Sequence, residues 1–273
     1  MIKLIATDLD NTALNRESHL SSGNRKAFED AMNKGIEVVI ATGRGLFGIP
    51  SEFFEIEGIR YAITSNGACI HNIKTGKVLL RYTLSESTAM KLLQIGKKYG
   101  AAYEIFVDGK AYVSKEYYAD PEKYGMPAFL HDYIISTRHP VDDIDAFIEE
   151  YKSVIENFAY VTKNDTMHRG IADEVIATCK DTFVTSSDPQ WVEVMSKESG
   201  KGKGLLHLCE YLNIDIKDTA AFGDADNDVE MLEYAGLSIA MENGSKACKK
   251  ASDFVSDFNY NDGVAKGIYD HIL

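Results

Sequence analysis

The stretch "IKLIATDLDNTAL", residues 2–14, decides the fold class of this chain. It begins as a largely apolar run, which is typical of a parallel strand that is buried on both faces. Asp8 and Asp10 follow at the end of this predicted strand, and two carboxylates so close together repel each other. Either they face water at the start of a turn, or they hold a cation between them. The answer depends on which other residues reach the same end of the strand.

The segments that follow repeat the same kind of strand. Ser21 or Ser22 can cap a helix that ends near Gly35, and residues 36–41 and 61–64 are two further apolar strands. Strand, helix and strand at this spacing predict a right-handed βαβ unit. The fold class is therefore α/β, with a Rossmann-like parallel sheet as its core.

The pattern changes from about residue 84 to residue 188. Amphipathic helices are expected over residues 88–100 and 141–158, mixed with hairpin-like segments. The clearest hairpin is "YEIFVDGKAYVS", whose turn is Asp108-Gly109. This part of the chain has the character of an α+β insert.

The βα rhythm returns after about residue 190. The stretch around Trp191 is predicted as a strand that re-enters the core, followed by a helix over 203–212, a strand over 219–222 and a helix that Gly236 closes. The predicted domains are a first core part, an inserted cap and a second core part, at 1–83, 84–188 and 189–273.

Composition excludes several classes of partner. The formal net charge of −13 speaks against a nucleic-acid partner, because phosphate backbones need a basic face. We expect no signal peptide and no membrane partner, since no apolar run approaches the ~20 residues of a membrane span. The four cysteines form no CxxC pair, which indicates reduced thiols and a cytoplasmic location.

The Asp-x-Asp pair is not the start of a calcium loop of the EF-hand type. Counted from Asp8, the sixth position is Ala13, where Gly is needed, and the twelfth is His19, where Glu is needed. A solvated turn stays open as the alternative for this motif taken alone.

Two further motifs follow predicted strands. Thr42 and Gly43 come directly after the second strand, where a hydroxyl and a backbone N–H suit a phosphate oxygen. Asp224, Asn227 and Asp228 lie in "FGDADND", after the strand at 219–222. Taken singly, the first is an ordinary turn and the second a solvated helix start.

The fourth motif is the glycine-rich stretch "SGKGKGLL", which carries Lys201 and Lys203. It is not a Walker loop, because neither Gly-Lys pair is followed by Ser or Thr. By itself it is typical of a flexible surface loop.

The joint order of these four motifs resembles the haloacid dehalogenase superfamily. The position of the insert, between "SNGA" (65–68) and "SGKG", resembles the Cof-type branch, whose cap domain is of the C2B kind. The resemblance covers essentially the whole chain. It implies a Rossmann-like core with an inserted α+β, C2-type cap.

The resemblance also implies catalytic roles. Asp8 would be the nucleophile that forms an aspartyl-phosphate, and Asp10 would be the general acid and base. Mg²⁺ would be held by the Asp8 carboxylate, the Asp10 backbone carbonyl, Asp224 and water molecules. Asp228 would act from behind these ligands, through metal-bound water or by orienting Lys201.

The transferring phosphoryl group would be held by five further groups: the Leu9 amide, Thr42, Gly43, Lys201 and Asn227. Lys201 is preferred to Lys203 because "KGKGL" fits the family pattern Lys-Gly-x-small-aliphatic, and because the catalytic lysine should precede the helix. Arg44 is a candidate contact to the leaving group, although an exposed arginine at a helix start is the alternative.

The expected function is Mg²⁺-dependent hydrolysis of phosphate monoesters of small metabolites, with sugar phosphates as the expected class. The partner would be a small phosphorylated metabolite, and the protein a monomer or a weak homodimer. One alternative is a phosphomutase, which returns the phosphoryl group to its substrate. Another is a regulatory protein that binds a metabolite on a fold that has lost catalysis, although no expected catalytic residue is missing here.

Overall fold

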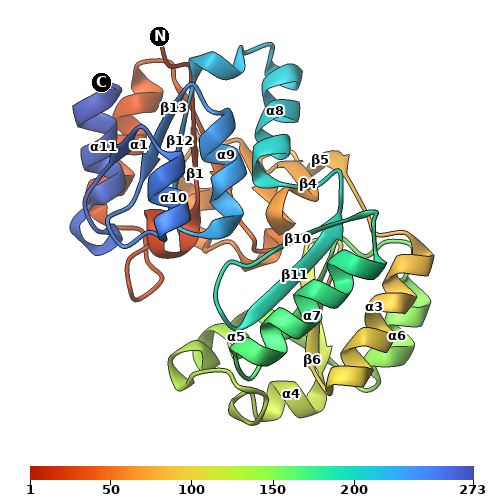
Figure 1. The fold of residues 1–273 in the computed structure, drawn as a ribbon. Helices are drawn as coiled ribbons and strands as arrows, with labels where there is room; N and C mark the ends of the chain where they lie inside the picture. Colours follow the sequence, from red (N-terminus) through yellow and green to blue (C-terminus); the bar gives the residue numbers. More distant parts are fainter. The chain divides into compact units, whose positions relative to one another are not determined.

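A computed structural model describes residues 1–273 and divides into two compact units (Figure 1). The first unit comprises Met1–Gly43, Ile49–Leu80 and Gly200–Leu273. The second comprises Arg44–Gly48 and Arg81–Ser199. No helix is both long and apolar enough to cross a lipid bilayer.

The first unit is built on an eight-stranded sheet with the order β14-β13-β12-β1-β2-β3-β4-β5. The strands from β14 to β3 run parallel, and β4 runs antiparallel to β3. The predicted α/β class with a parallel core sheet is therefore confirmed. The strands are β1 (Leu4–Thr7), β2 (Glu37–Ala41), β3 (Tyr61–Thr64), β4 (Cys69–Asn72), β5 (Lys77–Arg81), β12 (Thr219–Gly223), β13 (Leu237–Ala240) and β14 (Phe254–Val255).

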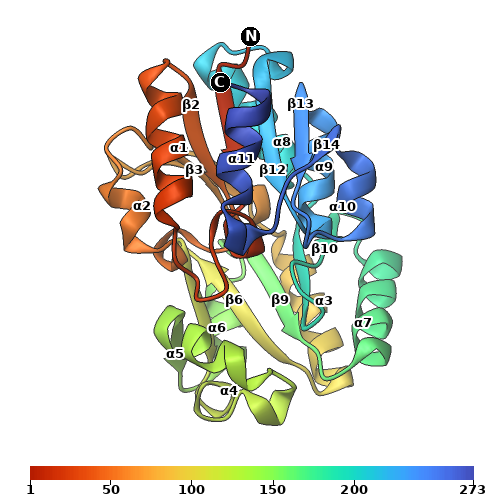
Figure 2. The ribbon, with the colours of Figure 1, turned by 90° about the vertical axis from the view of Figure 1, so that its left-hand side faces the viewer.

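Helices cover both faces of this sheet, as Figure 2 shows. One face packs against α8, α9 and α10 through a buried cluster that includes Leu4, Leu205 and Met231. The opposite face carries α1 and α11. Ser21 caps α1, because its side chain accepts a hydrogen bond from the Asn24 amide at 3.0 Å. The helices are α1 (Ser22–Asn33), α2 (Ser51–Glu55), α8 (Lys201–Leu212), α9 (Val229–Tyr234), α10 (Lys246–Ala251) and α11 (Gly263–His271), with short turns η1 (Leu9–Ala13), η3 (Ser65–Gly67), η6 (Ile216–Asp218), η7 (Asp226–Asp228) and η8 (Asn259–Asn261).

The second unit has a six-stranded sheet with the order β10-β11-β9-β6-β7-β8. Its strands pair antiparallel except β7 with β8. The predicted hairpin is confirmed: β6 and β7 are joined by Asp108 and Gly109, with φ of 49° and 75°. The strands are β6 (Ala102–Val107), β7 (Lys110–Ser114), β8 (Arg138–Val141), β9 (Asn157–Val161), β10 (Thr182–Thr185) and β11 (Trp191–Ser196).

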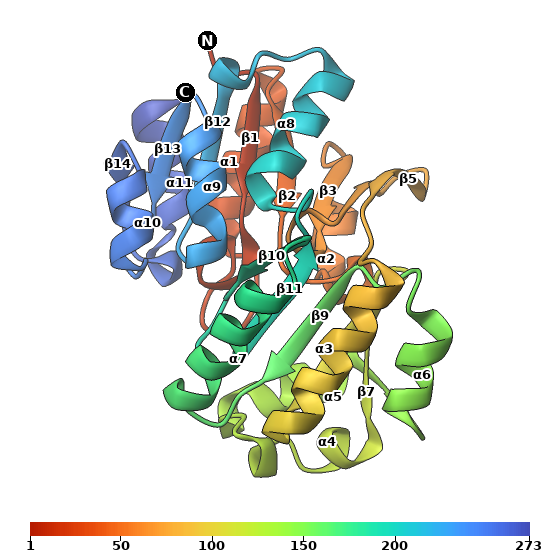
Figure 3. The ribbon, with the colours of Figure 1, turned by 45° about the vertical axis from the view of Figure 1, so that its right-hand side comes forward.

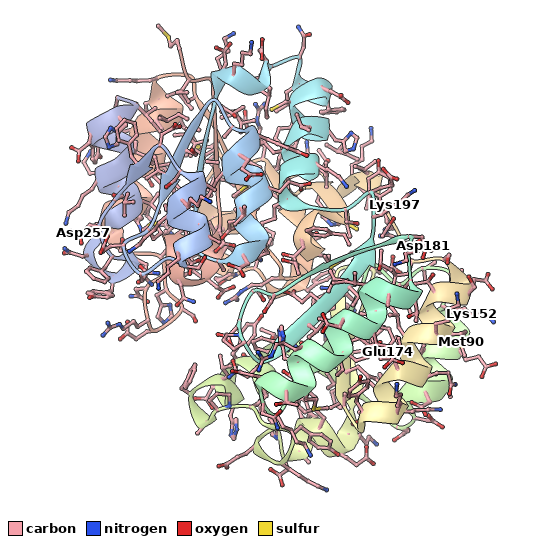
Figure 4. All side chains as sticks on the ribbon, in the orientation of Figure 1. Met90, Lys152, Glu174, Asp181, Lys197 and Asp257 are labelled. Carbon is pink, nitrogen blue, oxygen red and sulfur yellow. The ribbon has the colours of Figure 1, made fainter.

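Three helices, α3, α6 and α7, pack on one face of this second sheet (Figure 3). The start of α3 is tied to the loop after α7. Asp181 accepts hydrogen bonds from the hydroxyls of Ser85, at 3.0 Å, and Thr88, at 2.8 Å (Figure 4). The helices are α3 (Glu86–Tyr99), α4 (Lys115–Ala119), α5 (His131–Thr137), α6 (Ile144–Tyr151) and α7 (Asp165–Thr178), with short turns η2 (Leu46–Gly48), η4 (Glu122–Tyr124) and η5 (Ala128–Leu130).

Two sequence predictions in this region are wrong. The helix expected over 141–158 ends at Tyr151, and β9 begins at Asn157, because the β-forming residues from Phe158 onward pair with β6 and β11. The strand that contains Trp191 does not re-enter the core sheet. It is β11 of the second sheet, between β9 and β10.

Candidate active site

Four parallel strands, β12, β1, β2 and β3, bring the sequence motifs to one edge of the first sheet. Their carboxyl ends lie side by side, so the loops that follow them meet there. Asp8 follows β1, and its amide donates to the Phe222 carbonyl of β12 at 3.0 Å. Asp224 follows β12 directly. The register of β1 against β12 therefore carries the two acidic motifs to the same place.

Three buried carboxylates form the centre of this edge. Asp8, Asp224 and Asp228 are 5%, 8% and 0% exposed, and oxygen atoms from the three lie within 4.8 Å of one another. Asp8 is therefore not a solvated turn residue, which was one of the two alternatives for the Asp-x-Asp motif. Like charges at such distances need a compensating cation.

Lys201 supplies part of that compensation. Its Nζ lies 2.6 Å from Asp8 Oδ1 and 2.6 Å from Asp228 Oδ1, and the residue is 1% exposed. It is the first residue of α8, whereas the sequence predicted a lysine just before the helix. Lys203 lies two residues further along α8 and is half-buried, and its amide donates to Glu230 Oε2 at 3.3 Å.

The carboxylate of Asp228 accepts hydrogen bonds from Lys201 and from two backbone amides. While Oδ1 accepts from Lys201, Oδ2 accepts from the amides of Asp224, at 2.9 Å, and Ala225, at 3.0 Å. The carboxylate thus orients the lysine and fixes the loop that presents Asp224. Of the two ways in which Asp228 was expected to act, the contact to Lys201 is present.

The pKa values of Asp8, Asp224 and Lys201 are shifted by burial and by the excess of negative charge at this site. Burial raises the pKa of Asp8 to about 7, against the attraction of Lys201 and with added repulsion from Asp228 and Asp10. Burial, Asp8 and Asp228 also raise the pKa of Asp224 well above its usual range. Burial alone would lower the pKa of Lys201, but Asp228 and Asp8 outweigh it and raise that pKa.

The turn η1 explains the shape of the Asp-x-Asp-x-Thr motif. Asp10 keeps an extended backbone, and Asn11 has a left-handed one with φ of 58°. The chain therefore turns sharply after Asp10, and buried Thr12 donates its hydroxyl to Asp224 Oδ1 at 2.9 Å. Sequence reasoning gave Thr12 no role, although its place in the motif marked it. Leu9 is fully buried.

The predicted phosphate-binding residues of the first unit lie at the same edge. Thr42 is fully buried at the end of β2, and its amide donates to the Ile63 carbonyl at 2.9 Å; Gly43 follows it. Asn227 is 4% exposed, and its Nδ2 donates to Asn66 Oδ1 at 2.9 Å. Asn66 was missed, although it lies in the turn that follows β3, at the same edge of the sheet.

Arg44 belongs to the second unit. It is 7% exposed, so it is not the exposed arginine of the alternative reading. Its guanidinium donates to the Gly48 carbonyl at 2.7 Å and lies 4.6 Å from the ring centroid of Tyr133. A contact from Arg44 to a leaving group stays a prediction.

The carboxylate cluster fits a divalent cation. Three carboxylates face one ammonium group, which leaves an excess of buried negative charge. Carboxylate oxygens form the hard donor set that Mg²⁺ prefers. Asp8 and Asp224, together with the Asp10 carbonyl, are the groups that would hold such an ion.

Fold and site together define an α/β protein with a buried carboxylate–lysine centre at the carboxyl edge of its sheet. Residues 5–268 match the family model of the haloacid dehalogenase-like hydrolases. The 5-amino-6-(5-phospho-D-ribitylamino)uracil phosphatase YwtE of Bacillus subtilis (strain 168) is 30% identical over 285 residues, which cover 97% of this chain and 96% of that protein.

Solved structures agree with this match. A haloacid dehalogenase-like hydrolase from B. subtilis is 28% identical, with a TM-score of 0.86 over 100% of both chains. The haloacid dehalogenase subclass IIB sugar phosphatase BT4131 has a TM-score of 0.82 over 98% of both chains; at 22% identity, it shows a shared fold alone.

The chain therefore belongs to the haloacid dehalogenase-like hydrolases, and the resemblance drawn from its motifs is confirmed. It is an enzyme of the phosphatase class.

Proposed function

We propose that this enzyme hydrolyses phosphate monoesters of small metabolites, with Mg²⁺ as its cofactor and Asp8 as its nucleophile. One observation carries the proposal: the buried ion pairs that Lys201 makes with Asp8 and Asp228, beside Asp224. A lysine held against a buried carboxylate can bind a phosphoryl oxygen while the carboxylate attacks phosphorus.

In the first step, an Asp8 carboxylate oxygen forms a bond to phosphorus, and the bond from phosphorus to the ester oxygen breaks. Asp10 donates a proton to that leaving oxygen, so the alcohol departs neutral. Lys201 neutralises charge on the phosphoryl oxygens, and the Leu9 amide, Thr42, Gly43 and Asn227 donate hydrogen bonds to them.

In the second step, water attacks phosphorus and Asp10 accepts its proton. The bond between phosphorus and the Asp8 oxygen breaks, which releases orthophosphate and restores the carboxylate. A bound Mg²⁺ would supply charge neutralisation to the phosphoryl group and to Asp8. Asp228 holds Lys201 in place through both steps.

Phosphorylated sugars and polyols are the substrate class that we favour. The relative YwtE is named for a substrate with a phosphorylated ribityl chain, and the neighbour BT4131 is named a sugar phosphatase. Both names describe phosphate esters of polyhydroxylated molecules. Such an ester can lose its alcohol with one proton from Asp10.

A phosphate-ester panel tests the proposal. The protein should release orthophosphate from sugar and polyol phosphates with Mg²⁺ and lose this activity with EDTA. Asp8→Asn should abolish turnover, because an amide is no nucleophile, and Asp10→Asn should lose ~10²–10⁴-fold in kcat. Near wild-type rates for Asp8→Asn would refute the proposed chemistry. Transfer of the phosphoryl group back to the substrate would identify a phosphomutase instead.

A further inference from the structure

The turn η3, which follows β3, contains a residue to which the proposed reaction assigns no role. Asn66 is fully buried and has a left-handed backbone, with φ of 51° and ψ of 41°. Asparagine and glycine adopt this conformation more readily than other residues. The residue therefore suits a tight turn, but burial of its polar side chain still needs partners.

Those partners belong to three separate segments of the site. The Asn66 amide donates to the Thr42 carbonyl at 3.1 Å, and the Asn66 carbonyl accepts from the Gly200 amide at 2.9 Å. Its side-chain Oδ1 accepts from Asn227 Nδ2 at 2.9 Å. One residue thus joins the turn after β2, the start of α8 with Lys201, and the loop after β12.

Close packing beside Asn66 strengthens the second of these links. Gly67 has φ of 86°, and a Cβ at this position would lie 2.0 Å from the Gly200 carbonyl oxygen. The backbone of η3 therefore lies directly against the residue that precedes Lys201. Part of the glycine-rich character of "SNGA" and "SGKGKG" comes from this approach of two backbones.

The link to Asn227 fixes the direction of its amide. Nδ2 carries two hydrogens, and the hydrogen bond to Asn66 uses one of them. Asn227 Oδ1 is buried without a hydrogen-bond partner. Because Asn66 Oδ1 accepts from Nδ2, it selects the orientation in which the second hydrogen of Nδ2 can reach a ligand oxygen.

We propose that Asn66 is a positioning residue: it orients the Asn227 amide toward the phosphoryl group and holds the Thr42 turn and Lys201 in register around it. This role rests on the proposed function, since it needs a phosphoryl group at this edge. Asn66 itself need not touch the substrate. Its effect reaches the phosphoryl oxygens through Asn227.

The variant Asn66→Gly isolates the side chain. Glycine adopts the left-handed conformation without strain, so both main-chain hydrogen bonds can remain while the acceptor for Asn227 is lost. Asn213→Gly is the matched control. Asn213 is also left-handed, with φ of 54°, but it lies exposed at the opposite end of α8. Both changes increase the freedom of the unfolded chain equally.

Binding of inorganic phosphate, measured by calorimetry with Mg²⁺, gives a test that does not require turnover. Asn66→Gly should weaken phosphate binding about tenfold, the size of one lost hydrogen bond. Asn213→Gly should leave it unchanged. In an Asn227→Ala background, Asn66→Gly should have no further effect, because the group through which it acts is gone.

Nuclear magnetic resonance of the Asn227 side-chain amide adds a spectroscopic test. Its signal is identified by its loss in Asn227→Ala. The difference between the chemical shifts of its two protons should become smaller in Asn66→Gly, since neither proton would then be held in the hydrogen bond to Asn66. A merely structural role for Asn66 would lower thermal stability and change this signal without weakening phosphate binding.

The outcomes separate the two proposals. If the wild type binds phosphate and Asn66→Gly binds it equally well, or the two substitutions add, the role of Asn66 is refuted and the proposed function stands. If the wild type hydrolyses no ester but phosphate binding shows the expected coupling, only the proposed function fails. A wild type that binds no phosphate refutes both.

Discussion

Lys201 is the residue on which the charge balance of the site depends. It is one buried ammonium group between two carboxylates, each 2.6 Å away, and the geometry leaves it little freedom. Removing one partner of a buried ion pair leaves an uncompensated charge, which is costly. A substitution at this residue should therefore affect both stability and catalysis.

Lys201→Ala should cost about 3 kcal/mol of transition-state stabilisation, the size of one lost contact to the phosphoryl group. This corresponds to a fall in kcat/KM on the order of 10²-fold. Lys203→Ala should cost little, because Lys201 already supplies the ammonium group that contacts both Asp8 and Asp228. Both variants are compared on one substrate with Mg²⁺. The reverse ranking would mean that the motif has been placed two residues too early.

Stability of the metal-free protein should depend on pH through Asp8. Its pKa is raised from 3.8 to about 7, so between these values the folded state binds a proton that the unfolded state lacks. Folding is then favoured at the lower pH, and the free energy of unfolding in EDTA should fall as pH rises from about 4 to about 7.

Urea unfolding at pH 5 and pH 8 measures this slope. Asp8→Asn should reduce it, and saturating Mg²⁺ should reduce it too, because a bound cation favours the ionised carboxylate. Since Asp224 is shifted in the same direction, part of the slope should survive in Asp8→Asn. An unchanged slope in both experiments would contradict this account.

At the residue scale, the sequence predicted the charged side chains of the site together with Thr42 and Asn227, but gave no role to Thr12 and Asn66. Asp8, Asp224, Asp228 and Lys201 were predicted from the joint order of their motifs, each of which is common when taken singly. Asn66 lies in the quoted stretch "SNGA" but was given no role, because its importance comes from three hydrogen bonds to segments far away in the chain. Such contacts exist only once the sheet has formed.

At the scale of elements, local sequence was informative where one interaction decides the structure. The helix α1 begins at its serine cap, and the hairpin of β6 and β7 turns at Asp108-Gly109. The helix predicted over 141–158 is too long, because the helical periodicity of the sequence continues past Tyr151. The end of this stretch instead forms β9, which pairs with β6 and β11. The choice of sheet for β11 likewise depends on distant strands.

Asp181 should stabilise α3 through its contacts with Ser85 and Thr88. Partial burial opposes ionisation, but the hydroxyls of Thr88 and Ser85 lower the pKa of Asp181 below 3.8. Because Asp181 is exposed, solvent screens part of this interaction. Asp181→Asn should cost about 0.5 kcal/mol of unfolding free energy, the low end of the range for one hydrogen bond.

A depressed pKa stabilises the folded state above the unfolded value of about 3.8 and loses this contribution as pH falls through the folded value. The difference between the wild type and Asp181→Asn, measured by thermal unfolding, should hence be full at pH 6 and shrink below pH 4. Asp173→Asn, an exposed change of the same charge on α7, is the control. Equal effects of the two substitutions would show that only net charge matters.

At the scale of the whole molecule, the division into two units assigns the short segment Arg44–Gly48 to the second unit, although the sequence predicted it as part of the first. The chain passes between the units after Gly43, Gly48, Leu80 and Ser199. Arg44–Gly48 thus belongs to the second unit, where the Phe47 amide donates to the Gly109 carbonyl at 3.1 Å. Because this segment directly follows Thr42 and Gly43, the predicted phosphate-binding turn is joined through one peptide bond to a segment that is packed in the second unit.

Gly45→Ala tests this connection. A Cβ at Gly45 would lie 2.4 Å from the Gly109 carbonyl oxygen, so the segment would have to move away from the hairpin. We expect a raised KM with little change in Mg²⁺ binding. Gly48→Ala is the control within the same segment, since its Cβ would lie 3.5 Å from Arg44 Cβ, an ordinary contact. Equal KM values for the two variants would show that the position of this segment does not affect the phosphate-binding turn.

The second unit should determine substrate preference, because the groups predicted to hold the phosphoryl end all belong to the first unit. Exchanging residues 81–199 for those of a relative with another substrate should change the ranking of esters and leave Mg²⁺ dependence intact. Because Arg44–Gly48 packs on the exchanged hairpin, an exchange that also includes 44–48 should restore a higher kcat/KM than one that omits it. If the ranking of esters follows the first unit in both chimaeras, specificity resides in the first unit and this prediction is refuted.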